Sequence, residues 1–92
     1  GEADLLYPVR IQVQAWDRVG LVRDITSLVA EEKINITSIN LTNNDDQTIS
    51  TFLTLETKNL AQLSRLLAKI EGVRGVISTG RTDDGASAKV NS

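Results

Sequence analysis

The chain has 92 residues and a formal net charge of -2, and it contains neither Cys nor His. A chain of this length forms one domain with a modest core, and its charge gives no general attraction to nucleic acid or to an anionic membrane. Without Cys and His it lacks disulfides, thiolate metal sites and the usual general base, so we expect no cofactor and no catalysis by this chain alone.

The first predicted element is a strand from Val9 to Trp16. Apolar and polar residues alternate there, and a period of two indicates a strand with one buried face. Pro8 has no N–H and therefore suits the first residue of a strand. Trp16 falls on the polar face, beside the turn that follows.

That turn is Asp17-Arg18-Val19-Gly20-Leu21, and a helix from Leu21 to Glu32 follows it. Helical spacing is carried by the apolar residues Leu21, Ile25, Leu28 and Val29. Amides at a helix start can bind an anionic group, and Gly20 allows close approach because it has no Cβ. A simpler interpretation is that Asp17 only caps the helix and Gly20 only eases the turn. The five residues alone leave both interpretations open.

The second predicted strand runs from Ile34 to Thr42 and has an irregular pattern. Two apolar pairs fall on opposite parities, Ile34 with Ile36 and Ile39 with Leu41. A β-bulge around Thr37-Ser38 would turn both pairs inward, and bulges are common on edge strands. We therefore place this strand at the edge of the sheet.

A turn at Asn43 to Asp46 leads into a third strand from Ile49 to Glu56, which predicts a hairpin. Asn59 as N-cap, with Gln62 three residues later, predicts a second amphipathic helix that ends at Gly72. Residues 73–81 are rich in β-branched side chains and indicate a fourth strand.

The element order predicts an α+β fold, the ferredoxin-like βαββαβ sandwich, with two helices on one face of a four-stranded antiparallel sheet. The other face is then solvated, covered by a partner or shared in a dimer, with Trp16, Phe52 and Val76 on or near it. We divide the chain into a lead-in at 1–6, a folded domain at 7–81 and a disordered tail at 82–92.

Several functional classes use this fold, and most of them lack their signature here. The sheet has too few aromatic residues for an RNA-recognition module, the chain has no paired Cys or His for a metal chaperone, and Asp17 argues against a phosphate-binding first loop. A small-molecule sensor or a protein interaction module remains. In a sensor, Asp17 could bind an ammonium group while the amides around Gly20 and Leu21 bind a carboxylate.

The turn Asp17 to Leu21 and the sequence Ile34-Asn35-Ile36 resemble the ACT domain, over about Tyr7 to Arg81. Residues 15–26 and 32–36 resemble, more narrowly, the C-terminal ACT domain of RelA/SpoT-type enzymes, which make and degrade the alarmone (p)ppGpp in the stringent response. The resemblance implies a regulatory domain of a GTP pyrophosphokinase parent, and not an enzyme by itself.

The resemblance also implies a homodimer with an amino acid at its interface, a branched-chain one as the first choice. The ligand would contact Asp17, Gly20 and Leu21 of one subunit and Asn35 of its neighbour. Many ACT domains have Pro where this chain has Val19, and Pro would stiffen the turn.

The alternative function is a ligand-free interaction module that docks on ribosomal RNA or on the parent enzyme's own domains. Ribosomal RNA contact is implied by the same resemblance. Its candidate residues are exposed basic side chains, for which a solvated surface charge is the simpler interpretation: Arg10, Arg18, Arg23, Arg74 and Arg81. No apolar run reaches the roughly 20 residues of a membrane span and no signal peptide opens the chain, so we expect a cytoplasmic protein without membrane contact.

Overall fold

The computed structural model describes residues 5–82, and the elements follow the predicted order. The strands are β1 (Tyr7–Trp16), β2 (Asn35–Asn43), β3 (Thr48–Thr57) and β4 (Val76–Arg81), and the helices are α1 (Leu21–Glu31) and α2 (Leu60–Glu71). Residues 1–4 of the predicted lead-in and 83–92 of the predicted tail lie outside the described residues.

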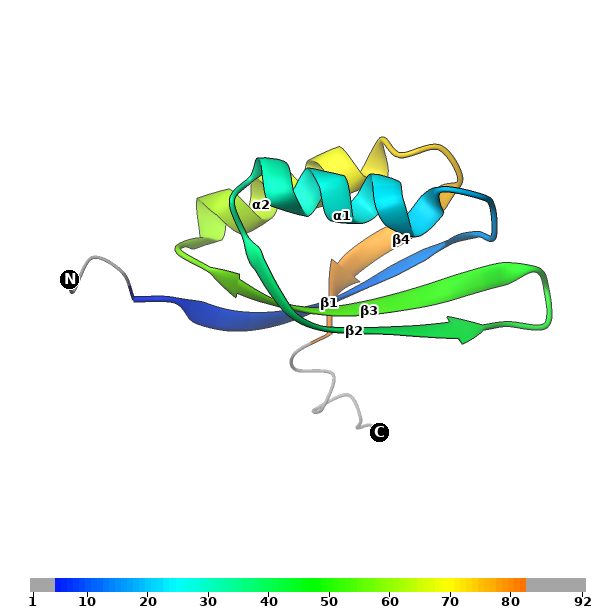
Figure 1. Ribbon diagram of the computed structural model, residues 1–92, viewed down its shortest axis with the longest axis horizontal. Coiled ribbons are helices and arrows are strands. Elements are labelled where there is room, and N and C mark those ends of the chain that lie inside the picture. Colours follow the sequence, from blue (N-terminus) through cyan, green and yellow to red (C-terminus); the bar gives the residue numbers. More distant parts are fainter. Residues whose placement is uncertain (1–4, 83–92) are drawn as a thin grey trace.

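The four strands form one antiparallel sheet in the order β2-β3-β1-β4, and both helices lie over the same face (Figure 1). The predicted ferredoxin-like sandwich is therefore confirmed. The central pair, β1 and β3, is in register from Tyr7 opposite Thr57 to Trp16 opposite Thr48. This register places the apolar residues of both strands on the helix side. The buried apolar core consists of Val9, Ile11, Val13, Ala15, Leu21, Ile25, Val29, Ile34, Ile49, Leu53, Leu55, Leu63, Leu66 and Ile70.

Strand β2 lies at the edge of the sheet and carries the predicted bulge, since its register against β3 shifts between Ile36 and Ser38. The bulge does turn Ile39 and Leu41 to the helix side, because they lie opposite the inward residues Leu53 and Thr51. Facing the helix side does not bury these two side chains, however. Ile39 is 41% exposed and Leu41 is 49% exposed, on a strand that pairs along only one of its edges.

The predicted N-cap of α2 is present. The Asn59 side chain accepts a hydrogen bond from the Gln62 amide at 2.8 Å, and Gln62 Oε1 accepts one from the Lys58 amide at 2.7 Å. Gln62 Nε2 also donates to the carbonyl of Glu32, at the end of α1, at 2.9 Å. Gln62 is only 6% exposed, so this one side chain both caps α2 and joins the two helices.

Three boundaries or orientations differ from prediction. Helix α1 ends at Glu31, and Glu32 forms its C-cap. Strand β4 begins at Val76 because a turn comes first, in which Val73 accepts a hydrogen bond from the Val76 amide and Gly75 has φ +95°. Val76 itself lies opposite Ala15, so it faces the helices and not the uncovered face of the sheet.

Candidate functional site

Three loops meet at the end of the sandwich where α1 begins. The Trp16 amide donates to the carbonyl of Gly75 at 2.9 Å, in the loop before β4. The Asp17 amide donates to the carbonyl of Gln47 at 3.1 Å, in the β2–β3 turn. The predicted ligand-binding turn is therefore held on both sides by backbone hydrogen bonds. We call the region of Asp17 to Arg23 the α1 mouth.

Gly20 is the N-cap residue of α1, with φ 84° and ψ 0°. This left-handed conformation costs a residue with a side chain about 1–2 kcal/mol, so the turn itself requires glycine. Within the described part of the chain no side chain caps the helix, and Asp17 is exposed. The simpler interpretation is thus right about Gly20 in the turn and wrong about Asp17 as a cap.

The first turn of α1 keeps amides that the helix does not use. The Leu21 amide donates to the Arg18 carbonyl at 3.3 Å, and the Asp24 amide donates to the Gly20 carbonyl at 2.9 Å. The amides of Val22 and Arg23 have no acceptor among residues 5–82. Because these amides lie at the positive end of the helix dipole, they can donate hydrogen bonds to an anionic group.

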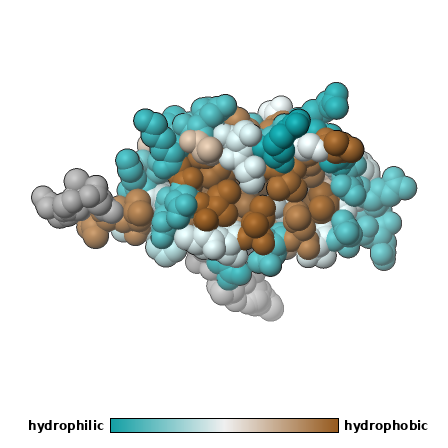
Figure 2. Space-filling view, viewed as in Figure 1, coloured by the Kyte–Doolittle hydropathy of each residue, from teal (hydrophilic) through white to brown (hydrophobic). Residues whose placement is uncertain are grey.

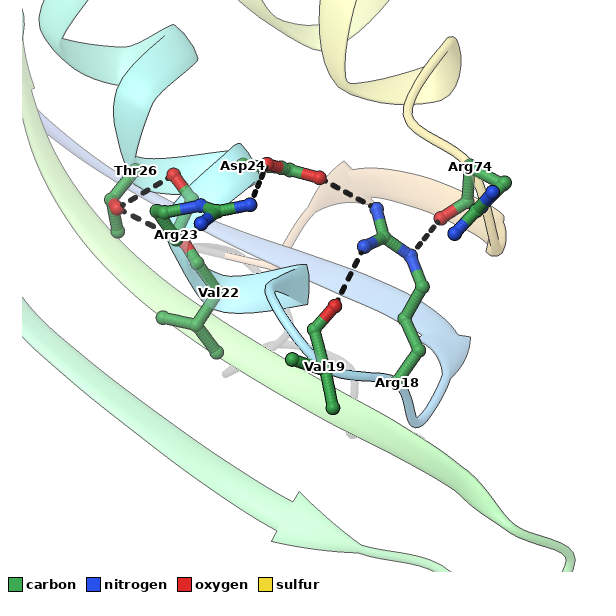
Figure 3. A network of polar contacts seen from close by, with 7 residues as sticks. All are labelled: Arg18, Val19, Val22, Arg23, Asp24, Thr26 and Arg74. Atoms are coloured by element: carbon green, nitrogen blue, oxygen red, sulfur yellow. Dashed lines mark hydrogen bonds and ion pairs between the residues drawn. The ribbon is translucent and has the colours of Figure 1, made fainter.

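The environment of Arg18 differs from the prediction. We expected an exposed cation, but its side chain is only 20% exposed and donates in three directions (Figure 3). Nη2 donates to Asp24 Oδ2 at 2.8 Å, Nη1 to the Val19 carbonyl at 3.0 Å, and Nε to the Arg74 carbonyl at 2.8 Å. Arg18 therefore ties the turn to α1 and to the loop before β4.

The charges at the α1 mouth are largely paired. The hydrogen bond from Arg18 lowers the pKa of Asp24 below its ordinary value of 3.8, against the opposing effect of partial burial, and Arg23 adds to the lowering. Arg23 Nη2 lies 3.6 Å from Asp24 Oδ1, and a Cβ at Gly20 would lie only 3.0 Å from Arg23 Nη2. The Arg23 side chain is 79% exposed, so it is free to move toward an incoming anion.

Asn35, the fourth predicted site residue, is not near the α1 mouth in one chain. Strands β1 and β2 are both antiparallel to β3, so the start of β2 lies at the end of the sheet where β1 begins. Asn35 Nδ2 donates to Glu56 Oε1 at 3.0 Å, and both side chains are partly or fully open to solvent. Only a second copy of the chain could bring Asn35 to Asp17.

Apolar side chains gather in a band between α1 and β2 (Figure 2). Ile39 and Leu41 of β2 face the helix side and are exposed, and Ile36 of the same strand is partly buried. Val19, in the turn before α1, is 97% exposed. Contiguous exposed apolar surface on a small domain is typical of a binding surface. Sequence parity indicated which face Ile39 and Leu41 occupy, but not that they are exposed there.

The described residues contain no group of three or more acidic side chains that could hold a metal ion. Within the same part of the chain, neither helix has the length and apolar character needed to cross a membrane.

Residues 4–81 match the family model described as the ACT domain. The chain belongs to the ACT domain family. This match covers nearly all of the described sandwich, including the α1 mouth and β2, and it confirms the resemblance found in the turn and in Ile34-Asn35-Ile36.

The relatives agree with the narrower resemblance to RelA/SpoT-type enzymes. The chain is 38% identical over 76 residues to a GTP pyrophosphokinase of Escherichia coli (strain K12), covering 82% of this chain and 10% of that protein. It is 35% identical over 81 residues to the bifunctional (p)ppGpp synthase/hydrolase RelA of Mycobacterium tuberculosis, covering 88% of this chain and 11% of that protein. The chain thus spans about a tenth of the length of these relatives.

A solved structure supports the same assignment. The crystal structure of the ACT domain from the GTP pyrophosphokinase of Chlorobium tepidum superposes with a TM-score of 0.72 at 26% identity. The match covers 83% of this chain and 97% of that one. ACT domains of RelA/SpoT-type enzymes are regulatory, and this chain is such a domain.

Proposed function

We propose that this chain senses an amino acid for a (p)ppGpp synthetase/hydrolase that acts in the cytoplasm during the stringent response. The observation that carries the proposal is the start of α1, where two amides lack acceptors among residues 5–82, next to the exposed carboxylate of Asp17. An amino acid offers one carboxylate and one ammonium, and these two features of the α1 mouth complement them.

In this proposal the ligand carboxylate lies against the amides of Val22 and Arg23, and the Arg23 guanidinium moves over it. The ammonium is bound by Asp17. Gly20 allows the approach because it has no Cβ, and Leu21 holds the turn through its hydrogen bond to Arg18. The Arg18 side chain stays with Asp24, so it shapes the site without contacting the ligand.

The second half of the proposed site comes from a second copy of the chain. Asn35 of that copy would exchange its bond to Glu56 for one with the ligand, since an amide can both donate and accept. The exposed apolar side chains of Val19, Ile39 and Leu41 would lie close to the ligand's side chain. This apolar surface supports a branched-chain amino acid as the preferred ligand.

Calorimetry with the 92-residue chain and valine, leucine, isoleucine, glutamate and lysine tests the proposal. We expect the branched-chain amino acids to bind, and Asp17→Asn and Asn35→Ala each to weaken binding about tenfold, the loss typical of a charge-assisted hydrogen bond. Asp45→Asn is the matched control, because Asp45 is an exposed carboxylate on the β2–β3 turn. Absence of binding by all five amino acids, or equal binding by Asp17→Asn, rejects the sensing role.

The alternative is docking on ribosomal RNA or on the parent's other domains. Arg10 and Arg23 are exposed, but they lie on different faces: Arg10 faces away from the helices opposite Thr54, and Arg23 lies at the α1 mouth. Arg18 is occupied by Asp24. The alternative predicts association with ribosomes that falls steeply with salt and is lost in Arg10→Glu and Arg23→Glu. Amino-acid binding without such association favours the sensing role.

A further inference from the structure

Strand β4 contains one residue more than its pairing with β1 uses. Val76 lies opposite Ala15, and the next pair along the strands is Ser78 opposite Gln14. Ile77 is therefore the extra residue of a β-bulge. The bulge leaves Ile77 49% exposed, whereas Val76 packs against the core. Of these two neighbours, the larger apolar side chain is thus the more exposed one.

A second arrangement of the same strand would remove the bulge. In it, Ile77 takes the place opposite Ala15 on the helix side, and Val76 moves back to the position of Gly75. The Trp16 amide, which donates to the Gly75 carbonyl at 2.9 Å, would then donate to the carbonyl of Val76. The core would gain one methylene, which favours this arrangement about fourfold. We call the observed arrangement the bulged register and the second one the regular register.

The loop before β4 explains why the bulged register is the one observed. Arg18 Nε donates to the Arg74 carbonyl at 2.8 Å (Figure 3). Gly75 has φ +95°, and a Cβ there would lie 3.6 Å from Arg18 Nε, so the loop packs closely along the Arg18 side chain. The regular register would push this loop back by one residue, about 3.3 Å along the strand, and would carry the Arg74 carbonyl away from Arg18. The Arg18 bond and the regular register therefore exclude each other.

We propose that β4 is a two-state strand whose register is selected by Arg18. In the bulged register Arg18 holds the Arg74 carbonyl and Ile77 is exposed. In the regular register Arg18 releases this carbonyl, and Ile77 replaces Val76 against the core. The states are discrete, because strand pairing shifts by whole residues. A hydrogen bond from a charged group outweighs one methylene only modestly, so the regular register is a minor state of about 0.1–10%.

Arg18 also connects this switch to the α1 mouth. The same guanidinium donates to Asp24 at 2.8 Å and to the Val19 carbonyl at 3.0 Å, so it holds the turn before α1 together with the loop before β4. An amino acid at the α1 mouth needs that turn in its observed form, and it should therefore favour the bulged register. By reciprocity, the bulged register favours the ligand. This response to a ligand rests on the proposed function, but the existence of two registers does not.

Methyl NMR distinguishes the two registers, because residues paired across adjacent strands have Cβ atoms only about 4.5–5.5 Å apart. The Ala15 methyl group lies next to the Val76 methyl groups in the bulged register, and it would lie next to those of Ile77 in the regular register. We expect the unaltered chain to show the contact between Ala15 and Val76. Relaxation dispersion should also detect exchange on the μs–ms timescale at the amides of residues 73–79.

Arg18→Met should raise the ratio of regular to bulged register about tenfold, the effect of losing a hydrogen bond from a charged group. Val76→Ala should shift the ratio in the same direction, because only the bulged register places residue 76 against the core. Ile77→Thr keeps the branched shape but adds a hydroxyl, and it should suppress the exchange. Arg74→Met is the matched control for Arg18→Met. It removes an exposed cation from the same loop but keeps the carbonyl that Arg18 binds, so it should leave the ratio unchanged.

The proposal is overturned if Arg18→Met keeps the Ala15–Val76 contact with unchanged exchange, if Arg74→Met shifts the register equally, or if Ile77→Thr exchanges like the unaltered chain. Val76→Ala leaves the Arg18 contacts intact and therefore tests the switch even if Arg18→Met does not fold. Absence of any Ala15–Ile77 contact in Val76→Ala also rejects the second register.

A titration of Val76→Ala with leucine tests the coupling to the α1 mouth. We expect leucine to shift the amides of residues 17–23 and to return β4 toward the bulged register. Leucine shifts at residues 17–23 without a change of register would reject the coupling. A register shift in the variants without any leucine shifts would reject the amino-acid site and leave the switch standing. Leucine binding without a second register in any variant would reject the switch alone.

Discussion

Arg18 and Asp24 form an ion pair of 2.8 Å that connects the turn before α1 to the first turns of that helix. The same guanidinium also donates to the carbonyls of Val19 and Arg74. The turn lacks the Pro that many ACT domains have at the position of Val19, so its backbone is less restricted by its own sequence. The Arg18 contacts hold the turn in place of that Pro.

The first prediction concerns this clamp. Arg18→Met keeps most of the aliphatic stem but removes three hydrogen bonds, and we expect the free energy of unfolding to fall by about 1–2 kcal/mol. For a domain of this size, that loss lowers the melting temperature by roughly 4–16 °C. Arg23→Met is the control, because the Arg23 side chain is mostly exposed and its ion pair is 3.6 Å long. Thermal unfolding followed by circular dichroism compares the two, and equal melting temperatures would show that the clamp is not stabilising.

The second prediction is a pH dependence from Asp24. Its pKa is lowered in the folded state, first by the hydrogen bond from Arg18, from an ordinary value of 3.8. The folded state thus binds this proton less readily than the unfolded state does. The pair stabilises the fold at pH values above about 4, and this contribution is lost as the pH falls through the folded pKa.

Asp24→Asn should therefore lower stability at neutral pH and flatten the decline of stability between about pH 5 and pH 2. Arg18→Met should flatten the same part of the curve, because it removes the group that lowers the pKa of Asp24. Urea unfolding at a series of pH values measures both. A curve for Asp24→Asn parallel to that of the unaltered chain would contradict the assignment.

The third prediction compares alanine substitutions at two glycines. Gly20 has φ +84°, so Gly20→Ala should destabilise the chain by about 1–2 kcal/mol and also obstruct the α1 mouth. Gly80 lies in β4 without a positive φ, and a Cβ there would meet nothing within 4 Å. Gly80→Ala should therefore be neutral or stabilising by up to about 1 kcal/mol, because Ala loses less entropy in a strand. Chemical denaturation of both variants measures whether each substitution lowers or raises the free energy of unfolding.

The periodicity of apolar residues explains how much of the fold could be predicted from the sequence. Alternation in residues 9–16 and helical spacing in 21–29 report which face of each element is buried, and parity alone located the bulge in β2. The interactions of Arg18 left no such pattern, because its acceptors come from the turn itself, from α1 and from the loop before β4, which meet only in the folded chain. The exposure of Ile39 and Leu41 depends on the packing around an edge strand, which periodicity does not encode.

The candidate site also has one part that the sequence could predict and one part that it could not. The need for glycine at position 20 follows from a strand-to-helix turn, so it could be predicted. The role of Asn35 could not be tested within one chain, because β2 begins at the far end of the sheet and Asn35 is bonded to Glu56. Its part in the site stays a prediction about a pair of chains.

The fourth prediction concerns Gln62, which is buried and bonded to both helices. Gln62→Ala leaves the Lys58 amide and the Glu32 carbonyl without their partner, and we expect a loss of about 2–3 kcal/mol in the free energy of unfolding. Asn59→Ala removes only the N-cap acceptor of α2 and should cost about 1 kcal/mol. Urea denaturation should therefore rank Gln62→Ala below Asn59→Ala. The opposite ranking would mean that the link between the helices contributes little.

The fifth prediction concerns self-association through the exposed part of β2. Leu41 is half exposed on an edge strand, so Leu41→Lys should change the stability of the isolated chain by less than about 0.5 kcal/mol. A lysine there places a charge on apolar surface that a second copy would cover, and charged side chains on edge strands oppose pairing between sheets.

Sedimentation velocity over a range of concentrations should show the unaltered chain associating to a dimer and Leu41→Lys remaining a monomer. Thr42→Lys is the matched control, because Thr42 is the next residue of the same strand and faces the other side of the sheet, opposite Ser50. It adds the same charge to the same edge and should leave the dimer intact if the apolar band is the contact surface. Loss of the dimer in both variants would place the contact on the strand edge itself, and a monomeric unaltered chain at every concentration would remove the second half of the proposed amino-acid site.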